Sequence, residues 1–422
     1  MAKEQILEKA YSRMIELYGN KDAQYRNHSP NIRILNRFCY EKQFLEGNKL
    51  YLRYLELVGR MRAHAKERGE HLVVKGTAAT SFIGYLLGAT DINPLKLHGY
   101  CPQCKFVSFK KGEGSPFDVP HQKCNCGKDI TVDGHGIFFD AKGGSLSRRD
   151  IEISVSCGFM NEAKKMICEE FSDMTIITLK DENATSPIRL CFLDKEENAA
   201  AEYPFDRSSE FSKYPHFLLV PVTYLDKFRA LEIATGVRME DAHSEDMMNV
   251  LLSFLNGDVD RIPCIDTNFV KTLIKKTSPV DYNELQKIIG FSCGTAVWNN
   301  NAEHLFLENR MTLANIPASR EDIYNDIVEK LVSNGFYEDG FAYEVADKAR
   351  RGYYARKGGV DKETVSGLLS LGFSVDFVFF IEKVQYMFPK HYTVTCLKYA
   401  IALMWYKIHY KKEFDMILGE SQ

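Results

Sequence analysis

The chain has 422 residues, of which 45% are hydrophobic and 26% charged, so it can hold two or three domains with apolar cores. A formal net charge of −3 excludes an overall basic field, so any surface that binds nucleic acid must be local. We find no signal peptide and no apolar run long enough to span a membrane, and the eleven cysteines do not indicate a disulfide framework, so we expect a cytoplasmic protein without a membrane partner.

Residues 1–71 carry apolar side chains at helical spacing and predict a helical region that packs against the next strand of the chain. That strand is predicted by a short apolar run, Leu72-Val73-Val74, and Phe82–Leu87 predicts a helix after it. The turn between them combines one cation with several hydroxyls and a glycine: Lys75, Gly76, Thr77, Thr80 and Ser81. Free N–H groups at a helix start bind anions, so these residues are candidate ligands for the phosphates of a nucleotide. The same turn also fits a capped strand-to-helix connection without a ligand.

Four cysteines come next in two pairs: Cys101, Cys104, Cys124 and Cys126. The two-residue gap in the first pair is that of a zinc knuckle, and four thiolates in a reduced protein indicate a structural zinc ion that staples a loop. The second pair has only one intervening residue, Asn125, which is a less comfortable spacing for one metal ion. His121 is an alternative ligand.

The stretch Asp150–Ser156 alternates acidic or polar with aliphatic residues and predicts a strand. Asp150 and Glu152 then lie on the same face, and paired acids downstream of a phosphate site are typical of centres that use two Mg²⁺ ions for phosphoryl transfer. An edge strand with solvated acids would show the same alternation.

Alternating helices and strands continue to residue 222, and helices dominate residues 223–422. The helical part contains a basic run with interleaved tyrosines, whose cations include Arg350, Arg351, Arg356 and Lys357. Such a run favours contact with a DNA backbone, although a charge run is often only a solvated face. We therefore expect an α+β fold in three parts: a helical region at 1–71, a mixed sheet at 72–222 with a zinc-ribbon insertion at 97–136, and a helical domain at 223–422.

Seven motifs follow one another along the chain: Lys75–Phe82, Ile92-Asn93-Pro94-Leu95, Cys101-Pro102-Gln103-Cys104, Asp133–Ile137, Asp150–Ser156, Phe291–Trp298 and Tyr386–His391. Their order is that of the palm and fingers of PolC, the C-family DNA polymerase III α subunit, and the chain resembles a truncated and divergent form of that region. The resemblance implies a polymerase palm at 72–222, helical fingers at 223–422, Asp150 and Glu152 as catalytic ligands of magnesium, and Lys390 as a further DNA contact.

The chain also departs from the family pattern. Glu152 stands where PolC has an aspartate, and Lys75 and Ala79 replace an arginine and a glycine in the nucleotide loop, which implies weaker nucleotide binding. The third catalytic acid of PolC lies on a strand whose nearest counterpart, His216–Val222, contains no acid. Asp226 and Glu232 come next, but we expect them on the solvent face of a helix.

Two hypotheses remain open from the sequence. One is a PolC-like replication protein that binds DNA and possibly nucleotide but is catalytically impaired. The other is an active DNA-directed DNA polymerase, a nucleotidyltransferase that uses two Mg²⁺ ions, or a polymerase fragment completed by a partner. Both predict primer-template or single-stranded DNA as a partner and a structural zinc ion, and both allow a replisome protein as a second partner.

Overall fold

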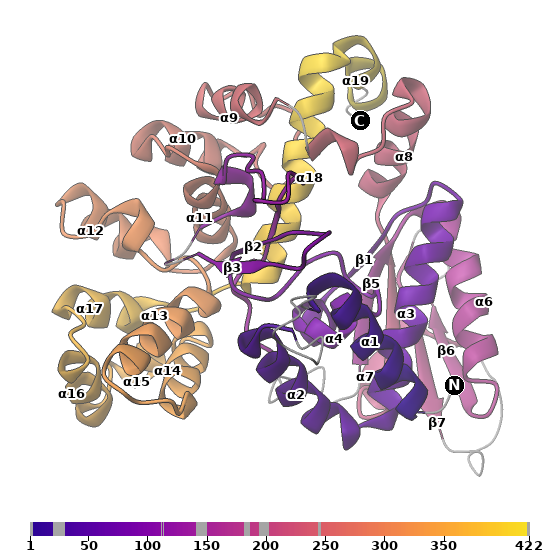
Figure 1. Cartoon of the computed structure of the whole chain (residues 1–422), viewed down its shortest axis with the longest axis horizontal. Coiled ribbons are helices and arrows are strands. Elements are labelled where there is room, and N and C mark those ends of the chain that lie inside the picture. Colours follow the sequence, from indigo (N-terminus) through magenta and orange to yellow (C-terminus); the bar gives the residue numbers. More distant parts are fainter. Residues whose placement is uncertain are drawn as a thin grey trace. The chain divides into compact units, whose positions relative to one another are not determined.

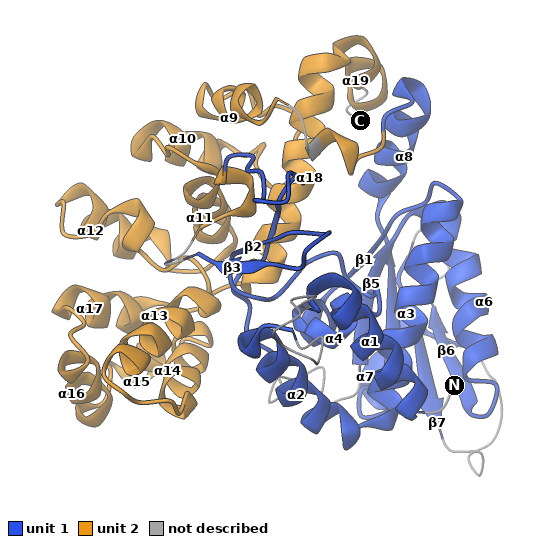
Figure 2. Cartoon of the chain, viewed as in Figure 1, with its two compact units in different colours: residues 1–112, 120–237 blue, residues 113–119, 238–422 orange. Residues whose placement is uncertain are grey.

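The computed structural model describes residues 3–19, 30–110, 112, 114–140, 150–180, 186–193, 202–243 and 246–419. The chain folds into two compact units (Figure 2). Unit 1 comprises Met1–Gly112 and Pro120–Val237, and unit 2 comprises Glu113–Val119 and Arg238–Gln422. None of the described helices is both long and apolar enough to cross a membrane.

Unit 1 is built on a six-stranded mixed sheet with the order β1-β5-β9-β7-β6-β8. Its strands, in that order, are Leu72–Val74, Asp150–Val155, His216–Pro221, Ile188–Leu193, Thr175–Lys180 and Glu202–Pro204. Figure 1 labels β1, β5, β6 and β7 of this sheet. The central strands β5 and β9 are parallel, whereas β1 and β7 pair with them antiparallel. The class is therefore α+β with a mixed sheet, which confirms that part of the prediction.

One face of this sheet carries the core of unit 1. Ile151 and Ile153 of β5 and Phe217 and Leu219 of β9 are fully buried there, because alternate side chains of a strand point to the same face. Residues of α3 and α6 belong to the same core. The helices of unit 1 are α1 (Lys3–Tyr18), α2 (Ile32–Glu46), α3 (Lys49–Glu67), α4 (Phe82–Leu86), α6 (Met160–Glu170), α7 (Ser208–Phe211) and α8 (Thr223–Thr235).

A second sheet of unit 1 has three short antiparallel strands in the order β3-β2-β4. They are β3 (Val107–Phe109), β2 (His98–Tyr100) and β4 (Thr131–Asp133). The four cysteines flank these strands, so the sheet and the cysteine turns together have the layout of a ribbon.

Unit 2 is helical among its described residues, and α18 (Lys390–His409) is its most buried helix. The other helices are α9 (Met247–Leu255), α10 (Asn268–Thr277), α11 (Tyr282–Cys293), α12 (Glu303–Leu307), α13 (Arg320–Ser333), α14 (Gly340–Arg350), α15 (Tyr353–Lys357), α16 (Lys362–Ser370), α17 (Val375–Lys383) and α19 (Lys411–Leu418). The segment Glu113–Val119 belongs to this unit, where Asp118 accepts hydrogen bonds from the backbone N–H groups of Tyr282 and Asn283 at the start of α11.

Candidate functional site

The two predicted acids lie side by side on β5. Asp150 is in register with His216 of β9, and Glu152 is in register with Leu218. Leu218 is in turn in register with Arg189 of β7. Because registered neighbours share a face of the sheet, Glu152, Leu218 and Arg189 form a row across three strands.

The three residues of this row line a cavity of about 230 Å³ in unit 1. The residues that line it are Lys75, Gly76, Asp150, Ile151, Glu152, Arg189, Ser212, His216 and Leu218. The structure therefore brings the predicted acids together with the lysine and glycine at the start of η1 (Gly76–Thr80). Gly76 has a φ of +69°, a left-handed conformation that glycine adopts without strain.

Lys75 is already engaged inside the cavity. Its Nζ lies 2.8 Å from Oε1 of Glu152, and its backbone N–H donates to the carbonyl oxygen of Glu152 at 2.9 Å. The ammonium group therefore neutralises one of the two acids. Arg189 brings a second cationic group to the same cavity.

His216 is the neighbour of the other acid. Its Nε2 lies 3.8 Å from Oδ2 of Asp150, and its ring is almost completely buried. The Nδ1 atom is 2.9 Å from the carbonyl oxygen of Tyr214, which can only accept, so Nδ1 carries a proton. The side of the imidazole that faces Asp150 is thus Nε2.

Asp150 also acts electrostatically on Tyr51, a buried residue of α3. The hydroxyl of Tyr51 in α3 is fully buried, and burial raises the pKa of Tyr51 well above its usual range, with further contributions from the charges of Asp150, Glu41 and Asp140. Asp140 is buried as well, yet it does not form a ligand cluster with Asp150 and Glu152.

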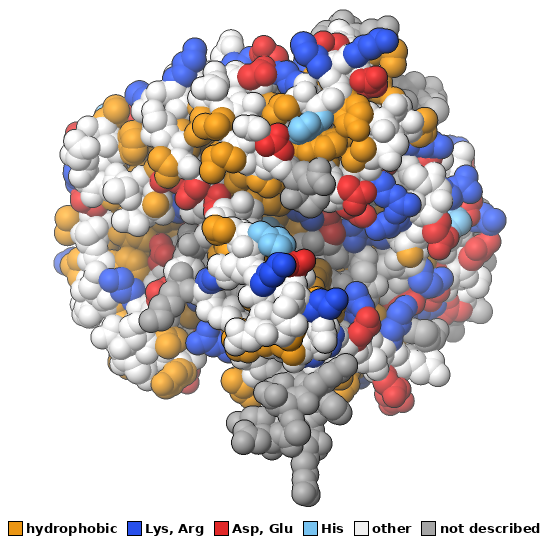
Figure 3. All heavy atoms as spheres, turned by 45° about the horizontal axis from the view of Figure 1, so that its top comes forward, with side chains coloured by type: hydrophobic (Ala, Val, Ile, Leu, Met, Phe, Trp, Pro, Cys, Tyr) orange, Lys and Arg blue, Asp and Glu red, His pale blue; other side chains and the backbone are white. Residues whose placement is uncertain are grey.

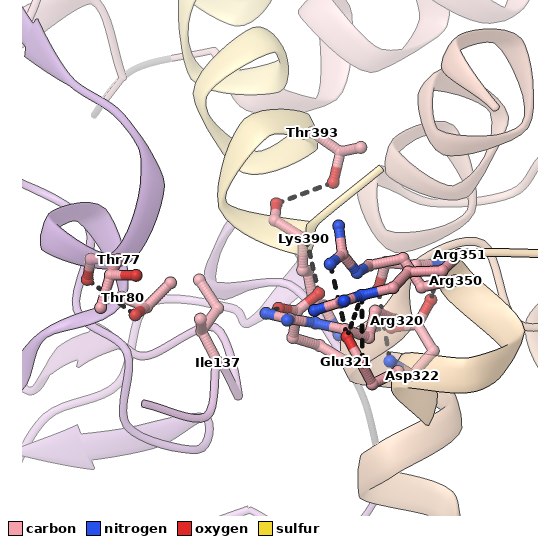
Figure 4. Close-up of polar contacts among 12 residues, drawn as sticks. Thr77, Thr80, Ile137, Arg320, Glu321, Asp322, Arg350, Arg351, Lys390 and Thr393 are labelled. Carbon is pink, nitrogen blue, oxygen red and sulfur yellow. Dashed lines mark hydrogen bonds and ion pairs between the residues drawn. The ribbon is translucent and has the colours of Figure 1, made fainter. Parts of the chain in front are cut away.

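The hydroxyl groups predicted to bind phosphate are buried within unit 1 and do not face the cavity. Thr77, Thr80 and Ser81 are buried and are not among the residues that line the cavity. Thr80 Oγ1 donates to the carbonyl oxygen of Thr77 at 2.8 Å, as Figure 4 shows, and Ser81 Oγ donates to Glu41 Oε2 at 2.8 Å. Only Lys75 and Gly76 of the predicted phosphate ligands face the cavity.

The start of α4 is occupied by a protein carboxylate. Glu41 of α2 accepts hydrogen bonds from the backbone N–H groups of Phe82 (2.8 Å) and Ile83 (3.0 Å), and it is fully buried. Arg37 donates to Glu41 at 2.6 Å and also to the carbonyl oxygen of Thr80 at 2.8 Å. Glu41 therefore holds the position at which the sequence predicted an anionic ligand.

No third carboxylate joins the pair on β5 within the described residues, since the four cysteines are the only His, Cys, Asp and Glu group there with three or more converging ligand atoms. Asp226 accepts a hydrogen bond from the N–H group of Cys157 at 2.9 Å. Glu232 pairs with His71 at 3.2 Å, and both of these side chains are mostly buried. These two acids hold α8 against the rest of unit 1 and are not the simple solvent-face charges that we expected.

The four cysteine sulfur atoms converge, with all of them within 4.8 Å of one another. Cys101 Sγ lies 3.4 Å from Cys126 Sγ, and Cys104 Sγ lies 3.5 Å from Cys124 Sγ. Thiolates around a tetrahedral zinc ion are about 3.8 Å apart because each Zn–S bond is about 2.3 Å long. The donor set and its spacing therefore fit zinc.

The local turns explain how both pairs reach one point. The N–H group of Cys104 donates to Cys101 Sγ at 3.4 Å, and a turn from Cys124 to Lys128 with Gly127 at a φ of +83° compensates for the short second spacing. Burial opposes ionisation of Cys101, but backbone hydrogen bonds outweigh it and lower the pKa of its thiol to about 6. His121 is not part of the cluster, since it lies beside Asp129 at 3.6 Å.

The cations of the basic run in unit 2 differ in exposure and in ion pairing. Arg351, Arg356 and Lys357 are exposed, whereas Arg350 is mostly buried and contacts Asp347 at 3.3 Å. Arg351 also contacts Asp347, at 3.0 Å. Arg356 and Lys357 have no acidic ion-pair partner among the residues that the structure describes.

Lys390 lies inside unit 2 and not on its surface. Only 5% of the residue is exposed, and Figure 4 shows its side chain beside Asp322, with Nζ 2.9 Å from Oδ1. Its backbone N–H donates to Glu321 at 2.7 Å. This lysine therefore joins the starts of α13 and α18 and is not available to a DNA phosphate in this structure.

Sequence reasoning did not identify three residues of these sites. His216 and Arg189 reach the cavity because β9 and β7 follow β5 in the sheet, although they are distant in sequence. Glu41 reaches α4 from another helix. The residues around these positions carry no pattern that would have marked them.

No family model matches the chain. Curated proteins named DNA polymerase III PolC-type are similar to it: that of Thermotoga maritima is 24% identical over 440 residues, which cover 86% of this chain and 31% of that protein. The protein of Streptococcus thermophilus is 25% identical over 492 residues and 97% of this chain, and that of Staphylococcus saprophyticus is 24% identical over 93% of it. The chain spans about a third of the length of these relatives. It is a divergent relative of the PolC-type DNA polymerase III proteins.

Proposed function

We propose that this chain is a DNA-binding replication protein whose six-stranded sheet corresponds to a polymerase palm, and in which magnesium-dependent nucleotidyl transfer is impaired. The relationship to PolC-type proteins supports a role in DNA replication. The proposed impairment rests on which residues line the cavity around Asp150 and Glu152.

The charge balance of this cavity disfavours two magnesium ions. Two carboxylates face two cations, Lys75 and Arg189, and Lys75 is in direct contact with Glu152. A divalent ion at Glu152 must displace the ammonium group or accept repulsion from it. Two-metal phosphoryl transfer depends on an excess of convergent carboxylates, which this site lacks among its described residues.

The neighbouring strand offers no replacement ligand of the right kind. Leu218 occupies the position beside Glu152, where a third acid would share a metal ion with it. His216 occupies the position beside Asp150, and Mg²⁺ prefers oxygen ligands to imidazole nitrogen. If a magnesium ion binds, Asp150 would hold it and Lys75 would contact a nucleotide phosphate.

Metal binding can be measured directly. Titration of the zinc-loaded protein with Mn²⁺, followed by the relaxation of water protons, should show weak binding at most. Leu218→Asp should tighten it, whereas Leu218→Asn, whose side chain has nearly the size of aspartate but no charge, should not. Tight Mn²⁺ binding by the unaltered protein that disappears in Asp150→Asn would contradict the proposal.

For DNA binding, we propose Arg351, Arg356 and Lys357 of unit 2 as the contact surface. All three are exposed, and Tyr353 beside them is 39% exposed. Figure 3 shows acidic and basic side chains interspersed over the face that it presents, in keeping with the net charge of −3. Binding would therefore depend on this local cluster and weaken with salt.

The test is the salt dependence of binding to a primed DNA duplex. Replacing the three cations by glutamine should weaken binding and lower the slope of log K against log salt by about one for each cation that no longer binds a phosphate. A control with the same charge change replaces Lys165, Lys411 and Lys412 of other helices and should bind as the unaltered chain does. Equally weakened binding in both variants would remove the assignment of this surface, and no binding at low salt would indicate a protein partner.

The second candidate function is an active polymerase, or a fragment that a partner completes. One observation favours it: Asp150, Glu152 and Lys75 line the same cavity. In that case a partner chain would supply the missing carboxylate. The zinc ion that we propose at the four cysteines is structural in both cases, because a site with four protein thiolates has no open position for substrate.

A further inference from the structure

Three cysteines of unit 2 come together away from the sites described above. Cys264 Sγ and Cys396 Sγ are 2.8 Å apart, and the charge of Cys293 acts on Cys396. The charge of Cys396 raises the pKa of the Tyr392 hydroxyl, with burial as a further cause. A disulfide bond is about 2.05 Å long, so the two sulfur atoms need to approach by roughly 0.8 Å to bond.

The backbone holds Cys264 in this position. Cys264 lies in the loop between α9 and α10. Its φ is 68° and that of Arg261 is 67°, a backbone conformation that residues other than glycine rarely adopt. The loop is tied to its neighbours, since Lys407 of α18 donates to Asp258 at 2.5 Å and Arg261 donates to Asp415 of α19 at 2.6 Å. The position of Cys264 against α18 is therefore fixed by several independent contacts.

The two thiols differ in reactivity. Cys264 is partly exposed, whereas Cys396 is 7% exposed on α18. The hydrogen bond between them lowers the pKa of Cys264 and raises the pKa of Cys396 well above its usual range. Cys264 is thus the accessible sulfur that ionises first, and the thiolate is the form that reacts with oxidants.

We propose that Cys264 and Cys396 form a reversible disulfide when the protein meets a peroxide. The Cys264 thiolate attacks one peroxide oxygen, the O–O bond breaks, and Cys264 becomes a sulfenic acid as the other oxygen leaves as water after protonation. The Cys396 thiol then attacks the Cys264 sulfur, the S–S bond forms, and the sulfenic oxygen leaves as a second water. Two thiols lose two electrons, and one hydrogen peroxide becomes two waters.

The bond would connect residues that are 132 positions apart and would link the loop after α9 to α18. A cross-link across so many residues restricts the unfolded chain, so the oxidised protein should melt at a higher temperature than the reduced protein. This proposal does not depend on DNA binding or on metal binding by Asp150.

Peptide mapping tests the proposal on the full zinc-loaded chain. After a small excess of hydrogen peroxide and alkylation of free thiols, trypsin should release the peptides 262–271 and 391–398 joined by a disulfide. Cys293→Ser, the matched control, should give the same product, and Cys396→Ser should instead trap Cys264 as a sulfenic acid that reacts with dimedone. Dithiothreitol should reverse the cross-link and the increase in melting temperature.

Several results would overturn the proposal. One is the absence of the joined peptides at peroxide doses that already oxidise other cysteines of the chain. Another is a cross-link from Cys264 to Cys293, or no dimedone adduct in Cys396→Ser. An oxidised protein that melts below the reduced one would show that the bond strains unit 2 and would also contradict this arrangement.

Discussion

Lys390→Met separates a structural role for this lysine from a DNA-contacting one. Methionine retains the aliphatic part of the side chain but removes the ammonium group 2.9 Å from Asp322, and both residues are at least 95% buried. Burial alone would raise the pKa of Asp322, but the charges of Lys390 and Lys287 hold it below its usual range, so the carboxylate is ionised at neutral pH. The variant removes the ion-pair partner of this buried carboxylate and leaves the charge of Lys287 to act on it.

Removing one partner of a buried ion pair costs about 3–5 kcal/mol of unfolding free energy. For a unit of this size each kcal/mol lowers the melting temperature by about 2–4 °C, so we expect a decrease of roughly 10 °C. The double variant with Asp322→Asn should regain part of this stability, because asparagine can still accept from the N–H groups of Ala318 and Ser319 without a stranded charge.

The assay is thermal and urea denaturation followed by circular dichroism, with DNA binding measured on the same samples. The control is Lys411→Met, which removes an exposed lysine from its 3.1 Å pair with Asp415 and should cost less than about 1 kcal/mol. Unchanged stability of Lys390→Met together with weaker DNA binding would refute the buried role and restore Lys390 as a phosphate contact.

Three further predictions test other parts of the structure. The purified protein should contain one zinc ion, and Cys101→Ser should lose it. Cys39→Ser, the control at an exposed cysteine outside the cluster, should retain the ion. Zinc bound to Cys101→Ser would contradict the site. Glu41→Gln should lower the unfolding free energy by about 2 kcal/mol, because it removes the charged acceptor at the start of α4 and the ion-pair partner of Arg37. An unfolding free energy equal to that of the unaltered chain would show that α4 does not need this carboxylate. Burial raises the pKa of Asp118 to about 6, with a further contribution from the charge of Asp281, so the folded state binds this proton more tightly than the unfolded state. The unfolding free energy should therefore fall as pH rises from about 4 to about 6. Asp118→Asn should flatten that part of the curve of unfolding free energy against pH.

Local sequence patterns were sufficient for part of the site. The alternation in Asp150–Val155 predicted the strand and the shared face of its acids, because strand periodicity depends only on neighbouring residues. The cysteine spacing predicted the cluster because thiol pairs at this spacing are typical of zinc sites, and the tight turn at Gly127 accounts for the short second pair.

The remaining features depend on contacts between distant segments. Arg189 and His216 enter the cavity through the strand order β5-β9-β7, which no local pattern encodes. Glu41 reaches the start of α4 from α2 and replaces the predicted anionic ligand. Lys390 follows a proline and resembles a surface cation in the sequence, but Asp322 of α13 draws it into a buried pair.

Primer extension tests the central claim most directly, which is that the cavity of Asp150 and Glu152 lacks the carboxylates for two-metal catalysis. The zinc-loaded chain should extend a primed template by no measurable amount with Mg²⁺ or Mn²⁺, and Asp150→Asn should give the same trace. Extension by the unaltered chain that disappears in Asp150→Asn would contradict the claim and establish an active polymerase.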